Sequence, residues 1–224
     1  MQTQPLKISG QTPIGVNDTW KNGIIKMKRG LLYSDGGGVT INHPTWSNLS
    51  LQSVLDMLDF DPVVLGIEIY NYDCEVDSET GWALTMWDNI LKTGRRCWGF
   101  AVPDHYAEYN DGENWQGSIS LFVPSNTQEN CLKAIRNGAF YIQQKHTTLA
   151  LTGMAVSGHS VTVTVSESAT IKTVIDGSTF DTSTGTSKTI SVPDDATYVR
   201  FEISTANDQI WTNPIMYKAR KRFD

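Results

Sequence analysis

The sequence predicts an α/β fold, because its first part alternates apolar strands with amphipathic helices and its last part has a different pattern. Three apolar runs, at 39–42, 63–70 and 97–102, are separated by stretches long enough for helices. Strand and helix alternation of this kind predicts a parallel sheet or barrel, with functional residues at the carboxyl ends of its strands. From about residue 149, Ser, Thr and Val dominate, and their period-two alternation predicts an antiparallel β module.

Each expected helix combines an apolar face with a capping signal. The helices are expected at 20–33, 51–59, 81–92 and between 126 and 137. Asp18-Thr19 precedes the first helix and Ser125-Asn126 precedes the last, in the positions that favour oxygen-bearing side chains. Glycines follow three of them, as is common at helix carboxyl ends.

The strands divide the chain into two expected domains, 1–148 and 149–224. The 63–70 strand is apolar on both faces for most of its length, which is typical of a strand covered on both sides. The other expected strands are 6–8, 118–123, 140–143, 159–165, 171–175, 189–192, 198–204 and 215–217. We expect the two domains to pack closely, because no low-complexity segment separates them.

Composition excludes several classes of protein. The 224 residues carry a formal net charge of -6, and basic residues cluster only at 218–222, so nucleic acid is not expected as a partner. The three cysteines are odd in number and lack CxxC spacing, which argues for reduced thiols. Because there is neither a secretory leader pattern nor an apolar span of membrane length, we expect a cytoplasmic protein without a membrane partner.

Polar residues follow all three apolar strands of the first part. His43 follows the first, Glu68 and Asn71 end the second, and Asp104-His105-Tyr106 follows the third. The carboxyl ends of parallel strands meet at one edge of a sheet. The sequence therefore predicts that His43, Glu68 and Asp104 lie within one concave mouth.

Six short motifs, in this order, carry a resemblance to a known family. They are His43-Pro44, Gly66-Ile-Glu-Ile-Tyr-Asn71, Trp87-Asp88-x-x-Leu91-x-x-Gly94, Trp98-Gly-Phe-Ala101 leading to Asp104, Lys133-Ala-Ile-Arg-Asn-Gly138 with Tyr141, and Trp211-Thr-Asn-Pro214. From about residue 20 to 217 the chain resembles the carboxyl-terminal portion of the PHP (polymerase and histidinol phosphatase) family of metal-dependent phosphoesterases. The resemblance implies a partial or distorted (β/α)7 barrel with metal ions at its carboxyl-terminal mouth, followed by a small antiparallel β-sandwich-like domain.

The resemblance also implies ligand positions, of which this chain keeps few. His43, Asp104 and His105 are the expected metal ligands, and Glu68, Asn71 and Tyr106 are expected at the rim of the pocket. The His-x-His of the family's first strand is absent, and Tyr106 stands where a histidine is expected. The alternatives are a His43 that only forms hydrogen bonds and a Glu68 bonded to nearby backbone. We expect at most one divalent ion, zinc, manganese or iron, held weakly.

Two functions fit this reduced set of ligands. Hydrolysis at a cluster of divalent cations needs four to six ligands for each ion and a metal-bound hydroxide. The first hypothesis is therefore a degenerate, non-catalytic protein with a binding or structural role, for instance in a phage or a surface assembly. The alternative is an active phosphoesterase whose missing ligands come from a partner chain or a preceding segment.

The absent first strands also bear on assembly. A closed barrel has no edges, whereas a sheet that begins at 39–42 presents unpaired backbone groups on an apolar strand. We therefore expect a second copy of the chain, or another protein, to cover this open edge. Symmetric pairing of two chains is the commonest arrangement for soluble oligomers.

Overall fold

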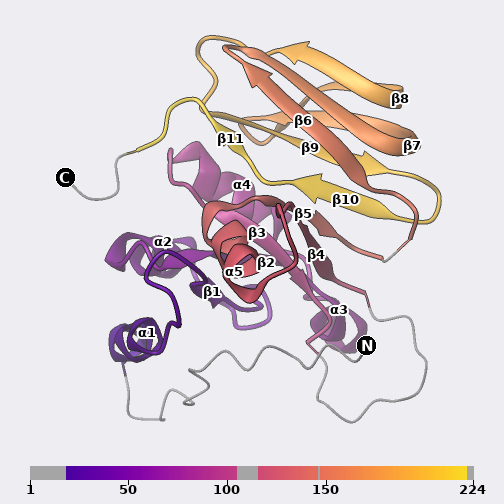
Figure 1. Ribbon diagram of the computed structural model, residues 1–224. Helices are drawn as coiled ribbons and strands as arrows, with labels where there is room; N and C mark the ends of the chain where they lie inside the picture. Colours follow the sequence, from indigo (N-terminus) through magenta and orange to yellow (C-terminus); the bar gives the residue numbers. More distant parts are fainter. Residues whose placement is uncertain (1–18, 105–115, 146, 221–224) are drawn as a thin grey trace.

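The computed structural model describes residues 19–104, 116–145 and 147–220, so the strand expected at 6–8 lies outside it. The helices are α1 (Trp20–Arg29), α2 (Leu51–Phe60), α3 (Tyr72–Ser78), α4 (Leu84–Lys92) and α5 (Gln128–Asn137). The strands are β1 (Val39–Ile41), β2 (Val64–Asn71), β3 (Trp98–Val102), β4 (Ser118–Leu121), β5 (Phe140–Gln143), β6 (Leu151–Ser157), β7 (Ser160–Ile175), β8 (Ser178–Ser191), β9 (Tyr198–Ser204), β10 (Gln209–Thr212) and β11 (Ile215–Met216). Figure 1 shows most of the helices gathered below a broad sheet.

The first three strands form a parallel sheet in the order β1-β2-β3, and this confirms the expectation that they lie parallel. The central strand β2 is buried along its whole length, because helices and the second sheet surround it. Gly66 allows β3 to approach, since a Cβ atom at this position would lie 1.8 Å from the carbonyl oxygen of Trp98. The parallel sheet thus places three strand ends at one edge.

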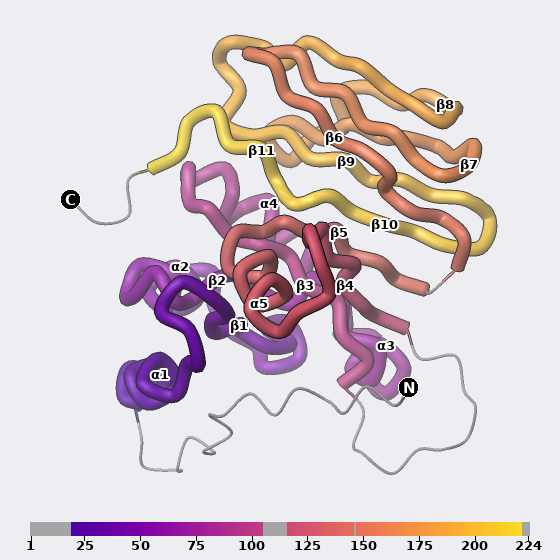
Figure 2. Tube along the Cα trace, viewed as in Figure 1, coloured from indigo at the N-terminus to yellow at the C-terminus, as the bar shows by residue number. Residues whose placement is uncertain are grey.

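The remaining strands form one antiparallel sheet in the order β4-β5-β10-β9-β7-β6, with β11 paired to β9 and β8 paired to β7. Figure 2 shows how the chain returns from β9 through β10 to lie beside β5. The strands β4 and β5 precede residue 149 but belong to this sheet, so the antiparallel sheet draws on both sequence ranges that were expected to be separate domains.

The expected (β/α)7 barrel is wrong. Of the residues that the structure describes, 39% lie in strands and 24% in helices, and the antiparallel strands form a curled half-barrel. The physical reason is the pairing of β5. This strand pairs antiparallel with β10 and does not extend the parallel sheet. The parallel sheet therefore ends at β3. The strands that follow it in the chain belong to the second, antiparallel sheet.

The expected sandwich-like domain is also replaced by this single curled sheet. The reason is the length of β7, whose 16 residues cover two of the expected strands. Its first half pairs with β6 and its second half pairs with β9, while β8 follows both halves across a break in register between Thr164 and Ala169. One long strand therefore holds all its partners in one sheet.

Local signals explain where the helices differ from expectation. The helix α1 ends at Arg29, because Gly30 caps it, and does not reach residue 33. The helix α3 is absent from the sequence prediction, yet the side chain of Asn71 caps it by accepting from the Cys74 backbone. Gly138 ends α5 in the left-handed conformation and lies against the ring of Trp98.

A buried ion pair joins the helical layer to the antiparallel sheet. Arg200 of β9, whose side chain is 1% exposed, donates Nε to Asp88 Oδ1 and Nη2 to Asp88 Oδ2, both at 2.8 Å. Tyr198 donates its hydroxyl to the same carboxylate at 2.6 Å, and Arg200 also lies 5.0 Å from the ring centre of Trp87.

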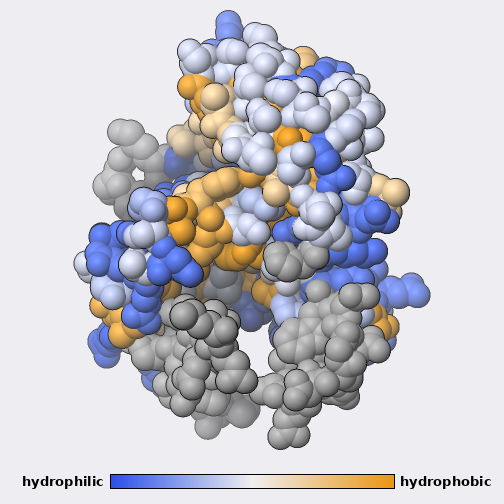
Figure 3. All heavy atoms as spheres, turned by 45° about the vertical axis from the view of Figure 1, so that its right-hand side comes forward, coloured by the Kyte–Doolittle hydropathy of each residue, from blue (hydrophilic) through white to orange (hydrophobic). Residues whose placement is uncertain are grey.

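In Figure 3 hydrophobic residues gather in the middle of the molecule, whereas the upper end is mostly pale.

Other features agree with the composition. The three cysteines, Cys74, Cys97 and Cys131, are all free thiols, as expected. Among the helices that the structure describes, none is long and apolar enough to cross a membrane.

The Arg200→Met variant should lose about 3–5 kcal/mol in the free energy of unfolding, because it leaves the carboxylate of Asp88 buried without its partner. Urea denaturation monitored by circular dichroism measures this loss. The double variant Asp88→Asn/Arg200→Met should lose less than the sum of the single variants. An Arg200→Met protein as stable as the parent would contradict this role, and Lys133→Ala, in an exposed ion pair, is the control.

Candidate functional site

The carboxyl ends of β1, β2 and β3 meet through the amide of Asn71. Asn71 Nδ2 donates to Glu68 Oε2 at 3.0 Å and to Asp104 Oδ2 at 2.9 Å. Glu68 Oε2 also accepts from the backbone N–H of His43 at 2.6 Å. One buried amide and one buried carboxylate thus connect all three strand ends, and they bring His43 and Asp104 to the same small region.

Two of these residues adopt a backbone conformation that is unusual for side-chain-bearing residues. His43 has a φ of 31° and Asp104 a φ of 57°, both in the left-handed region. Such conformations cost on the order of 1–3 kcal/mol and gather at functional sites, where the surroundings impose them. The hydrogen bonds to Glu68 and Asn71 supply that restraint here.

The turn after His43 is held at several points. The His43 ring shares a hydrogen bond of 2.8 Å with the hydroxyl of Ser47, and Ser47 N donates to the His43 carbonyl at 2.9 Å. Thr45 Oγ1 donates to the Trp82 carbonyl at 2.9 Å and so ties the turn to the start of α4. Trp46 nevertheless remains 56% exposed at the apex of this turn.

A cavity of about 160 Å³ opens at this edge of the sheet. Its lining residues are His43, Trp46, Asp73, Cys74, Asp77 and Asp104. Burial and the negative charges of Asp104 and Glu68 raise the pKa of the Cys74 thiol to about 11. Cys74 is therefore a neutral thiol near pH 7, and not a thiolate ready to attack a substrate.

Glu68 acts within the protein interior rather than at the rim. It is 3% exposed, and desolvation by burial raises its pKa above the ordinary value, although the hydrogen bonds from Asn71 and His43 act in the opposite direction. Glu68 accepts a hydrogen bond from nearby backbone, the N–H of His43, but it does so inside the protein and not at the rim of the pocket. Asn71, which is fully buried, is likewise an internal residue.

The expected metal ligands are only partly within the described structure. His43 and Asp104 line one cavity, whereas His105 and Tyr106 lie outside the described residues. Within residues 19–104, 116–145 and 147–220, no group of at least three His, Cys, Asp or Glu side chains is arranged to hold a metal ion. These residues therefore do not fit the cluster that metal-assisted hydrolysis requires.

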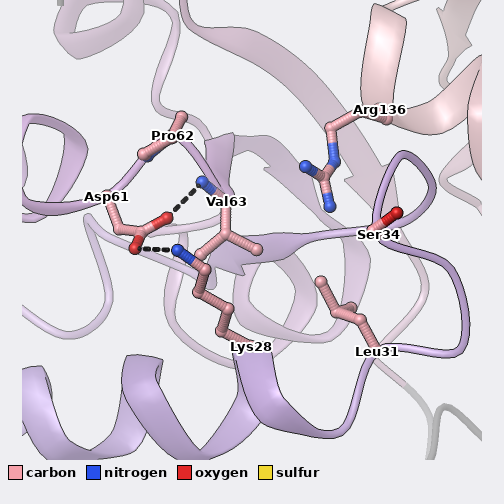
Figure 4. Close-up of a pocket in the computed structure, with 7 residues that line it drawn as sticks. All are labelled: Lys28, Leu31, Ser34, Asp61, Pro62, Val63 and Arg136. Carbon is pink, nitrogen blue, oxygen red and sulfur yellow. Dashed lines mark hydrogen bonds and ion pairs between the residues drawn. The ribbon is translucent and has the colours of Figure 1, made fainter. Parts of the chain in front are cut away.

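A second, larger cavity of about 410 Å³ lies at the opposite ends of the parallel strands, next to Val63 (Figure 4). Its charged groups already have protein partners. Lys28 pairs with Asp61 at 2.7 Å, and Arg136 donates to the carbonyl oxygens of Gly36 and Gly37. These contacts fix the loop before β1 against α5, so we assign this cavity a structural role.

Sequence reasoning found the strand ends but missed four of the six residues that line the 160 Å³ cavity. Trp46, Asp73, Cys74 and Asp77 come from the turn after β1 and from α3, which was not expected. The usable signal was Asn71 followed by Asp73, because Asn is a favoured capping residue and acidic residues favour a first helical turn.

Comparison of the chain with protein-family models, with curated proteins and with solved structures found no match in any of the three.

The Glu68→Gln variant should reveal the raised pKa of Glu68. Because the folded chain holds this proton more tightly than the unfolded chain, the stabilisation is fully present below 4.5 and is lost as pH rises through the raised pKa. The stability of the parent relative to Glu68→Gln should therefore fall as the pH rises above 4.5 and through the raised pKa of Glu68. Denaturation at several pH values measures it, with the exposed Glu79→Gln as control. A relative stability that rises with pH would contradict the assignment.

Proposed function

We propose that this chain is a binding module whose ligand site is the 160 Å³ cavity at the ends of β1, β2 and β3, and that it does not hydrolyse phosphate esters by itself. The observation that carries the proposal is the use of Glu68 and Asn71. Their polar atoms bond to His43, Asp104 and the start of α3, so they position the cavity wall instead of binding a metal.

The atoms left facing the cavity support binding rather than hydrolysis. Hydrolysis of a phosphate ester needs an activated nucleophile and positive charge that stabilises the developing charge of the phosphoryl group. The cavity instead holds carboxylates, a neutral thiol and a histidine. Carboxylates repel a phosphoryl group, so the lining disfavours that substrate unless several cations neutralise it. His43 and Asp104 are enough for at most one weakly held zinc, manganese or iron ion.

The isolated chain should therefore show no phosphoesterase turnover above the protein-free rate, with or without added manganese or zinc. The assay uses p-nitrophenyl phosphate and a phosphodiester analogue, beside metal analysis of the purified protein. His43→Ala should keep the fold, as measured by thermal denaturation, and should lower any metal content. Turnover that a chelator abolishes and that His43→Ala removes would overturn the proposal.

A metal-dependent phosphoesterase remains the second candidate. The observation in its favour is that His43 and Asp104 follow β1 and β3, on either side of β2, line one cavity and have restrained, left-handed conformations. This function requires further ligands from a partner chain or from another segment. It predicts that activity appears only when the completing partner is present.

We also propose that a second copy of the chain, or another cytoplasmic protein, covers the free side of β1. Among the strands that the structure describes, β1 is an edge of the parallel sheet and pairs with β2. Its apolar residues Val39 and Ile41 are each 7% exposed. An uncovered edge of this kind favours strand addition.

Light scattering at low micromolar concentration should therefore report a particle larger than one chain. Replacing Thr40, the partly buried middle residue of β1, with proline should dissociate it, because proline removes a backbone donor from the strand. Circular dichroism checks that the variant is folded. A parent protein that is strictly monomeric would contradict the assembly.

A further inference from the structure

The proposed cavity contains a feature that its structural role does not require, which is an exposed tryptophan on a restrained turn. Trp46 is 56% exposed, although three backbone hydrogen bonds hold the turn around it. Two side-chain hydrogen bonds add to them, from Thr45 to the Trp82 carbonyl and between His43 and Ser47. A large apolar ring held still in water contributes little to folding. Its position is better explained by a ligand that covers it.

Trp46 and His43 form an aromatic corner at the cavity. Their ring centres lie 5.0 Å apart and their planes are at 82°, and both residues line the cavity. Two rings set nearly at right angles can contact a small rounded group on two sides. The electron-rich face of a Trp, Tyr or Phe ring attracts cations, and this attraction is strongest for tryptophan.

The charges of the other lining residues favour a ligand of one sign of charge. Asp73, Asp77 and Asp104 all line the cavity, and their charges, with that of Glu68, help to raise the pKa of Cys74. Cys74, which is 7% exposed, adds a thiol to the lining groups. The potential in the cavity is thus negative, and an anion is disfavoured.

The arrangement does not suit a compact metal ion, because within the described ranges no group of three or more ligand side chains is placed to bind one ion. A cation with its charge spread over a larger group needs no such convergence. The cavity is also smaller than the range of about 300–1,000 Å³ that is usual for drug-sized ligands. It therefore suits one small head group rather than a whole large molecule.

We infer that the cavity takes an alkylammonium group, with Trp46 and His43 against its apolar surface and the carboxylates balancing its charge. This inference rests on the proposed function, because it names the ligand class of the same site. The ligand can be a free amine or a head group carried by a larger molecule.

Isothermal titration of the full chain with choline chloride, in a buffer containing a chelator, tests the inference. The matched control ligand is 3,3-dimethyl-1-butanol, which has the shape of choline without its charge. Choline should bind, and the alcohol should bind at least about tenfold more weakly. Trp46→Ala should weaken choline binding about tenfold, whereas Trp46→Phe should retain part of the affinity. Phe180→Ala, which removes another exposed ring from the distant β8, should leave the affinity unchanged.

The alternative outcomes are distinct. Equal binding of choline and the alcohol, unchanged affinity in folded Trp46→Ala, binding of methyl glucoside but not choline, or no choline binding at millimolar concentration would each overturn the inference. The phosphoesterase assay is a separate readout. Turnover together with Trp46-dependent choline binding would overturn the proposed lack of catalysis and leave the ammonium site intact.

Discussion

The ion pair between Arg200 and Asp88 is the contact on which the arrangement of the two sheets depends. Burying a guanidinium is costly unless carboxylates surround it, and Arg200 meets two, Asp88 from α4 and Glu202 from its own strand. Since α4 also packs on β2, the pair sets the antiparallel sheet relative to the parallel one. Asn213 adds a second link, because its side chain accepts from Gly99 N of β3 and donates to the Phe140 carbonyl of β5.

The parallel part of the fold was readable from the sequence because its determinants are local. Apolar runs, capping residues and intervening helices all lie within residues 19–102, and the three strands pair with their neighbours in the chain. The antiparallel sheet was not readable in the same way. The partner of β5 is β10, more than 60 residues later, and nothing near residue 140 distinguishes that partner from another parallel strand. A long-range pairing therefore decided against the barrel that the resemblance implied.

The candidate site was likewise predictable only in part. His43, Glu68, Asn71 and Asp104 were predictable, because strand ends follow from strand limits. Their separate roles were not, since these depend on which polar atoms meet. A single amide, Asn71 Nδ2, satisfies both carboxylates, and its Oδ1 caps the helix that brings Asp73 and Cys74 to the cavity. The position of Trp46 depends on the left-handed φ of His43, and no local sequence pattern predicted this conformation.

The same network is the reason why we propose binding rather than catalysis at this site. A catalytic group has to change its protonation or coordination during a reaction, whereas Glu68 and Asn71 each restrain two or more neighbours at once. Moving either would release the strained backbone at His43 or Asp104 and the first turn of α3 together. Glu68 and Asn71 therefore hold His43, Asp104 and the first turn of α3 in place, and these segments carry the residues of the cavity wall. A rigid, negative and partly aromatic wall is complementary to a ligand that already carries a positive charge. Binding of such a ligand requires no reacting residue.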